Sequence, residues 1–101
     1  MTPSPPDLPA IPTVQIDDER VRVTEWRFPP GAATGWHVHE YAYVVIPMTT
    51  GQLTATSREG TSSAELVQGQ SYTRAAGVEH DVRNANDFEF VFVEVELKAY
   101  H

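Results

Sequence analysis

Two histidines, His37 and His39, are separated by one residue in the run GWHVHEYAYVVIP. Because successive side chains of a β-strand point to opposite faces, this offset places both imidazoles on the same face. Such a pair has the geometry of a two-histidine metal clamp, although spacing alone leaves a structural role open. By the same alternation Tyr41 and Tyr43 share that face, and Glu40 points to the other side.

A third histidine, His80, follows a turn at Gly77 and opens the run HDVRN. A returning antiparallel strand would bring it to the same place as the first two. Three histidines form a facial set that suits Zn, Fe, Ni, Mn or Cu. The chain contains no cysteine, so a metal must be held by histidine, carboxylate or phenolate groups. We therefore expect one divalent metal ion on His37, His39 and His80. His101, the final residue, is left out of the site.

The residues around these histidines resemble two known motifs. Gly31-X5-His37-X-His39 followed by Gly51 resembles the first motif of the cupin superfamily. The segment Gly69-X5-Ala75-X-Gly77-X2-His80-X3-Asn84 resembles the second, with Ala75 where the family usually has proline. The resemblance spans roughly Val21 to Leu97. The sequence around both motifs is also similar to the short cupins grouped with β-alanine degradation proteins. It implies an all-β, single-domain cupin, an RmlC-like jelly-roll β-barrel.

One departure from the first motif concerns its glutamate ligand. The family normally has Glu after three or four intervening residues, where this chain has Tyr43 and Val44. Three neutral imidazoles would leave the site with a net charge of about +2 rather than about +1, which favours anionic chelators. Tyr43 could ligate as a phenolate. Its reference pKa of about 10 makes a hydrogen-bonding role the better interpretation.

The sequence indicates the metal site more specifically than it indicates the reaction. The resemblance to three-histidine cupins, which include thiol and diketone dioxygenases, favours Fe2+ and a dioxygenase acting on a small organic acid or carbonyl compound. Zn2+, Ni2+ or Mn2+ would instead suit Lewis-acid chemistry, as in an isomerase or lyase. A non-catalytic small-ligand-binding module is a further alternative. In the enzyme hypotheses Tyr41, Tyr43 and Arg74 orient the substrate.

Arg74 shares one face of a short strand with Tyr72, where the two could hold a carboxylate at the mouth of the site. An exposed rim or a dimer salt bridge is the alternative. The expected ligand is therefore a small, anionic molecule.

Composition limits the partners and the architecture. A chain of 101 residues with 41% hydrophobic content is enough for one domain. Fourteen acidic and seven basic residues give a net charge of -7, and no Lys/Arg cluster occurs, so nucleic acids and anionic membranes are disfavoured partners. No positively charged start or long apolar run is present, so we expect a cytoplasmic protein.

Proline and turn residues divide the chain. Five prolines in the first twelve residues predict an extended N-terminal arm over residues 1–13, before a barrel domain over 14–98. In the last predicted strand Phe88, Phe90 and Phe92 share one face and Val91, Val93, Val95 and Leu97 share the other. Both faces should therefore be covered, and we expect a homodimer. The turn-bounded strands are predicted over 14–17, 20–28, 36–47, 52–57, 64–67, 71–74, 80–84 and 88–98.

Overall fold

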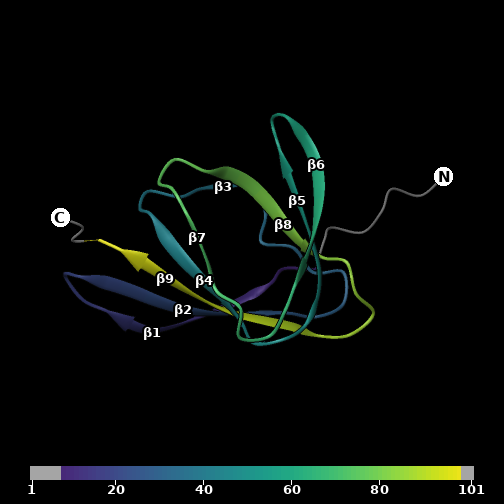
Figure 1. Cartoon of the computed structure of the whole chain (residues 1–101), viewed down its shortest axis with the longest axis horizontal. Coiled ribbons are helices and arrows are strands. Elements are labelled where there is room, and N and C mark those ends of the chain that lie inside the picture. The colour runs from purple at the N-terminus through teal and green to yellow at the C-terminus, as the bar shows by residue number, and fades with distance from the viewer. Residues whose placement is uncertain (1–7, 99–101) are drawn as a thin grey trace.

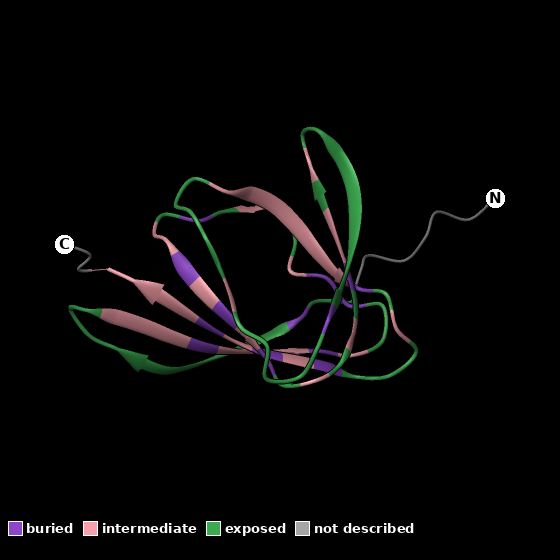
Figure 2. Cartoon of the chain, viewed as in Figure 1, coloured by how far each residue is buried: buried purple, intermediate pink, exposed green. Residues whose placement is uncertain are grey.

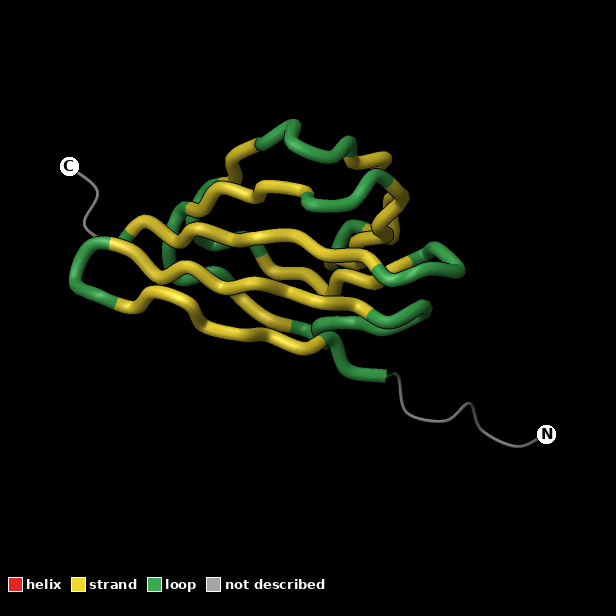
Figure 3. The backbone as a smooth tube through the Cα atoms, turned by 90° about the horizontal axis from the view of Figure 1, so that it is seen from below, coloured by secondary structure: helices red, strands yellow, loops and turns green. Residues whose placement is uncertain are grey.

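A computed structural model describes residues 8–98 of the chain, and its regular structure there is entirely β-strand (Figures 1 and 3). No helix in this part of the chain is long and apolar enough to cross a membrane. The strands follow the alternating and β-branched runs of the sequence, with turns at the polar and glycine-containing segments between them. Their bounds are β1 (Ile11–Asp17), β2 (Val21–Phe28), β3 (His37–Val38), β4 (Tyr43–Pro47), β5 (Gly51–Ser57), β6 (Gly60–Leu66), β7 (Tyr72–Arg74), β8 (Glu79–Asn84) and β9 (Phe90–Leu97).

The strands form two antiparallel sheets that face each other. One sheet has the order β1-β2-β9-β4-β7 and the other β3-β8-β5-β6 (Figure 1). Consecutive strands alternate between the sheets at several points, which is the crossing pattern of a jelly roll. No hydrogen-bonded strand pairing closes the two sheets into a continuous barrel in residues 8–98. The predicted all-β jelly roll is confirmed, in the form of a two-sheet sandwich.

The core lies between the sheets, and many of its buried residues, purple in Figure 2, belong to β2, β4 and β9 of the five-stranded sheet. Phe28 and Phe90 are fully buried, and the rings of Phe28 and Phe92 pack with centroids 5.3 Å apart. The register of β2 and β9 pairs Phe28 with Phe90 and Trp26 with Phe92, so these aromatic rings come from adjacent strands. Burying an aromatic side chain of this kind stabilises a fold by about 3–5 kcal/mol relative to alanine.

Asn84 fastens the end of β8 to two loops. Its side chain is almost completely buried, and its Nδ2 donates hydrogen bonds to the carbonyl oxygens of Phe28 (3.0 Å) and Phe88 (2.8 Å). Its Oδ1 accepts a hydrogen bond from the backbone N–H of Asn86 at 2.8 Å. The role of this asparagine in the described structure is to hold these backbone segments together. Because it closes β8, it also fixes the strand that carries His80.

Some predicted boundaries are wrong. The segment 36–47, predicted as one strand, is divided into β3 and β4, which lie in different sheets, because the chain crosses the sandwich between them. β1 begins at Ile11, before the predicted start, and β6 begins at Gly60. Phe88 precedes β9 and is 44% exposed, so it does not share the buried face of Phe90. Residues 1–7 of the predicted arm and His101 lie outside the described residues.

Candidate metal centre

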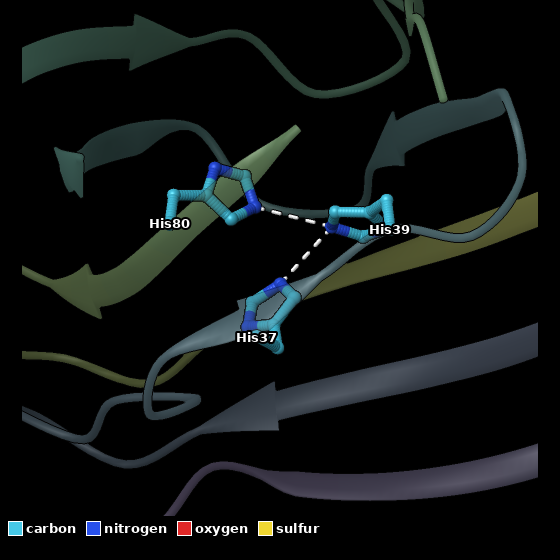
Figure 4. Close-up of side chains that lie close together, drawn as sticks. All are labelled: His37, His39 and His80. Carbon is cyan, nitrogen blue, oxygen red and sulfur yellow. Dashed lines mark hydrogen bonds between the residues drawn. The ribbon is translucent and has the colours of Figure 1, made fainter. Parts of the chain in front are cut away.

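The three histidines come together between the two sheets. β3 pairs with β8 so that His37 is directly opposite His80, and His39 follows immediately after β3. The Nε2 atom of His39 lies 3.0 Å from that of His37 and 3.1 Å from that of His80 (Figure 4). Converging nitrogens from three imidazoles form a group that could hold a metal ion. The predicted cluster is therefore present in the structure.

A glycine turn helps to position this cluster. Gly77 has φ of 94°, a left-handed conformation that residues with a Cβ rarely adopt. Its N–H donates to the carbonyl oxygen of His39 at 2.8 Å, and the N–H of His39 donates to Val78 at 2.9 Å. The turn before β8 is thus hydrogen-bonded to the backbone of one histidine and leads into the strand that carries another, His80.

The protonation of His37 follows from its neighbours. Its Nδ1 lies 2.9 Å from the carbonyl oxygen of Gly35, which can only accept, so Nδ1 carries the proton and donates. The hydroxyl of Thr34 lies 3.2 Å from the same nitrogen. In the neutral ring the lone pair is then on Nε2, the atom that faces the other two histidines. This is the tautomer that a metal ligand requires.

His39 is the most enclosed of the three, with 7% of its surface exposed. Burial, assisted by the neighbouring histidines, lowers the pKa of His39 to about 4, and the same causes with Arg74 lower the pKa of His80 to about 4. Both rings are therefore neutral near pH 7. Neutral imidazoles are the form that binds metal, so protons compete weakly at this site.

The spacing of the histidine nitrogens tests whether they could bind one metal ion together. Metal–nitrogen bonds of about 2.1 Å at right angles place two ligand atoms about 3.0 Å apart, and tetrahedral angles place them about 3.4 Å apart. The separations of 3.0 and 3.1 Å match the right-angle case. The third separation, between His37 and His80, is within 4.8 Å, so the three nitrogens lie close enough together to bind one metal ion.

A cavity of about 80 Å³ adjoins the histidines. Its inner walls include Leu53, Leu66 and Phe92, and its polar lining includes Tyr43 and Arg74. This is small beside the ~300–1,000 Å³ of pockets for drug-sized ligands. A molecule that fills it while contacting the histidines must have few heavy atoms.

Tyr43 contributes a buried hydroxyl to the cavity. Its side chain is 2% exposed, and its Oη has no hydrogen-bond partner among the described residues. Burial is the main cause that raises the pKa of Tyr43 well above its usual range, with Glu94 adding to it. The phenolate is therefore disfavoured in the metal-free protein, and the hydroxyl is a free donor for a bound molecule.

Two wider clefts open beside the cluster. One, of about 470 Å³, is lined by residues that include Arg58, Arg74 and His80. The other, of about 310 Å³, includes Tyr41 and His37 in its wall. The histidines thus lie between an enclosed cavity and solvent-accessible grooves, which gives a ligand a route to them.

The predicted substrate-orienting residues occupy different positions. Tyr43 and Arg74 line the inner cavity, whereas Tyr41 is absent from its walls and lies in the second cleft. The alternation used to place Tyr41 beside the histidines fails because the strand ends at Val38. The Arg74 guanidinium lies 5.5 Å from the centre of the Tyr72 ring, in cation–π contact.

Glu94 is a site residue that the sequence interpretation missed. It is 7% exposed and lines the inner cavity, and its Oε1 lies 3.3 Å from Nδ1 of His39. Burial raises the pKa of Glu94 to about 7. The signal in the sequence is that Glu94 continues the inward series of Phe90 and Phe92, where a charged residue would otherwise be out of place.

Comparison with known proteins extends these observations. Residues 24–96 match the family model described as a cupin domain. A protein of Pseudomonas aeruginosa named beta-alanine degradation protein BauB is 57% identical over 89 residues, which cover 88% of this chain and 94% of that protein. A crystal structure of a cupin domain from Bordetella pertussis has 60% identity and a TM-score of 0.93, covering 95% of this chain and 100% of the other.

A more distant likeness concerns the fold alone. The structure of an uncharacterised conserved protein from Klebsiella pneumoniae, described as having a double-stranded β-helix domain, is 20% identical with a TM-score of 0.74. The match covers 94% of this chain and 82% of the other. The two-sheet arrangement is thus retained where most of the sequence has changed.

Proposed function

Because this chain belongs to the cupin family, we propose that it is a metal-dependent enzyme acting on a small organic acid or carbonyl compound. One divalent transition metal ion is held by His37, His39 and His80. The observation that carries the proposal is the convergence of their Nε2 atoms, at 3.0 and 3.1 Å, beside a small cavity with polar groups. Fe2+ is the favoured ion because the sequence resembles three-histidine cupins that include dioxygenases; Zn2+, Ni2+ and Mn2+ are the alternatives that three imidazoles also suit.

When bound, such an ion supplies Lewis acidity and coordination positions for substrate and, in the case of Fe2+, for O2 as oxidant. The chain supplies the binding groups. The unpaired hydroxyl of Tyr43 donates a hydrogen bond to a substrate oxygen, and the guanidinium of Arg74 attracts a carboxylate from the side of the open cleft. Tyr41 acts from the wall of the other cleft.

The substrate we propose is a small anion of the kind met in β-alanine degradation. The supporting observation is the 57% identity to BauB, which is named for that process. The cavity of about 80 Å³ agrees in scale with an acid of a few carbon atoms. Arg74 provides the positive charge that such an acid would need.

Metal content and oxygen uptake test the proposal. Protein purified without a histidine tag or chelator is analysed for metals, then loaded with Fe2+ under anaerobic conditions. O2 consumption is followed on adding β-alanine and small oxo and hydroxy acids. Iron at about one per chain with substrate-dependent uptake supports the dioxygenase. Zinc or nickel with turnover but no uptake would replace it with a Lewis-acid isomerase or lyase. Ligand-dependent stabilisation without turnover would indicate a binding module.

A homodimer is the proposed assembly, in the cytoplasm. The outer face of the five-stranded sheet carries an apolar row in which Val95 lies between its cross-strand partners Val23 and Val44. All three are only partly buried in the single chain. A second copy covering this row would remove its apolar surface from water.

A further inference from the structure

The buried carboxylate of Glu94 is not placed to bind the metal itself. The group of possible ligand atoms that lie within 4.8 Å of one another comprises the three histidines and does not include Glu94. Its contact is instead with the opposite side of the His39 ring, where Oε1 lies 3.3 Å from Nδ1. Glu94 therefore lies behind a ligand rather than among the ligands.

The surroundings of Glu94 show that the site is built to hold it there. β9 pairs with β2 and β4 on its two sides, so Glu94 is opposite Thr24 and Val45 at the centre of the sheet. A hydrogen bond from the Trp26 side chain favours its ionised form. A carboxylate enclosed to this degree is costly unless it has partners. The contacts with Trp26 and His39 are the partners that the structure gives it.

His37, the other histidine of the His37–His39 pair, also has a hydrogen-bond acceptor next to its Nδ1 atom. Nδ1 of His37 donates to the carbonyl oxygen of Gly35 at 2.9 Å, so its Nε2 is free for a metal. In metal sites, an acceptor behind the ligating imidazole fixes its tautomer and orientation and increases its basicity. His37 has a neutral acceptor in this position, and His39 has a carboxylate. The carboxylate ligand expected from the first cupin motif is absent, because Tyr43 and Val44 occupy its position. Glu94 instead supplies a negative charge next to His39.

We propose that Glu94 is the positioning residue of His39. Its carboxylate accepts the Nδ1–H of the ring, directs the lone pair of Nε2 toward the metal, and places a negative charge behind the ligand instead of on the ion. This inference rests on the metal centre of the proposed function. It predicts that Glu94 controls metal affinity and the state of the Nδ1 proton, although it does not touch the ion.

The test is metal affinity in matched variants. Zn2+ binding to the full chain is measured by competition with a chelator for the wild type, Glu94→Gln and Glu89→Gln. Glu89 directly precedes the same strand and loses the same charge, but it pairs with Arg27 at 2.6 Å on the outer face rather than with a histidine. We expect Glu94→Gln to bind Zn2+ about 10- to 100-fold more weakly. Glu89→Gln should stay within about twofold of the wild type, since exposed ion pairs contribute little.

A second measurement separates positioning from a general loss of stability. In the Zn2+-saturated, 15N-histidine-labelled protein, we expect a slowly exchanging Nδ1–H signal from His39, assigned by its loss in His39→Ala. Glu94→Gln should shift this signal or speed its exchange, whereas Glu89→Gln should leave it unchanged. A variant with lower thermal stability but wild-type affinity and an unchanged signal would overturn the inference while leaving the metal centre intact. A wild-type chain that binds no Zn2+, Ni2+ or Fe2+ would overturn both.

Discussion

The ring of Tyr43 lies stacked on the ring of His39, with centroids 3.8 Å apart and planes inclined by 17°. The two residues belong to different parts of the fold, since His39 follows β3 and Tyr43 opens β4 in the other sheet. The chain between them crosses the sandwich and brings the rings face to face. Tyr43 thus restrains the histidine by packing, and its hydroxyl has no hydrogen-bond partner among residues 8–98.

The first prediction concerns metal stoichiometry. Replacing His37, His39 or His80 with alanine removes one of three converging donors, so metal retained after dialysis should fall to a small fraction of the wild-type value. His101→Ala, which alters the remaining histidine, is the matched control and should keep the full amount. Elemental analysis of all four variants is the measurement. Unchanged metal in His80→Ala would contradict the three-histidine assignment.

The second prediction concerns the pH dependence of stability in the metal-free protein. His39 and His80 have pKa values of about 4 in the folded protein and 6.5 in the unfolded chain. Their contribution to the free energy of unfolding is therefore complete above pH 6.5 and is lost as the pH falls toward 4, because the unfolded chain binds protons more readily. Glu94 has a folded pKa of about 7 against 4.5, so its contribution is present below pH 4.5 and is lost as the pH rises through 7. The two effects oppose each other between pH 4.5 and 6.5.

It follows that the free energy of unfolding should rise more steeply with pH in Glu94→Gln than in the wild type over that interval. Between pH 6.5 and 7 the wild type should lose stability while the variant stays level. Urea denaturation of both proteins without metal, at half-unit pH steps, measures this difference. Parallel curves would show that Glu94 does not titrate in the folded state as stated.

The third prediction concerns the unpaired hydroxyl of Tyr43. Tyr43→Phe keeps the ring on His39 and removes a buried hydroxyl that has no partner in the described part of the chain. A buried polar group left unsatisfied costs about 1–3 kcal/mol. We expect the metal-free variant to melt a few degrees higher, with unchanged Zn2+ affinity, and to show lower kcat/KM once a substrate is found. Tyr41→Phe, whose hydroxyl interacts with Glu40 at the surface, should not gain stability. A lower melting temperature in Tyr43→Phe would mean that the hydroxyl has a partner in solution.

The fourth prediction concerns recognition of anions by Arg74. A charge-assisted hydrogen bond contributes about 1.5–3 kcal/mol, so Arg74→Met should weaken binding of oxalate to the Zn2+-loaded protein about tenfold or more. Its metal content should not change. The control is Arg27→Met, which removes a cation paired with Glu25 and Glu89 on the outer face. Isothermal titration of oxalate into each protein makes the comparison, and equal affinities would exclude Arg74 as the anion-binding group.

The fifth prediction concerns the proposed dimer. Val95→Glu puts a charge in the middle of the apolar row with Val23 and Val44, so we expect a folded monomer where the wild type is a dimer. Thr61→Glu, on the exposed strand β6 of the other sheet, should remain dimeric. Light scattering after size-exclusion chromatography gives the masses, and circular dichroism checks folding. A monomeric wild type would remove the dimer from the proposal.

The sequence was sufficient for the fold class and for the three histidines. Alternating apolar residues bounded by glycine and proline predict strands locally, and the spacing of His37, His39 and His80 matches two motifs that together are specific. The error lay between Val38 and Tyr43, where an uninterrupted run of strand-forming residues contains a crossing from one sheet to the other. Strand preference is a property of single residues, but the crossing depends on which strands pair with β3 and with β4.

Glu94 illustrates a second limit of prediction from the sequence. Its acidic side chain in an inward series is visible in the sequence, but no local pattern says which histidine it will meet. The sequence by itself determined an all-β chain with three candidate metal ligands and no glutamate at the usual ligand position. Only the tertiary structure decided that Glu94 lies behind His39 and that Tyr43 packs on the same ring. These contacts depend on the register of β9 against β4 and on how the two sheets face each other, and both are set by packing across the whole core.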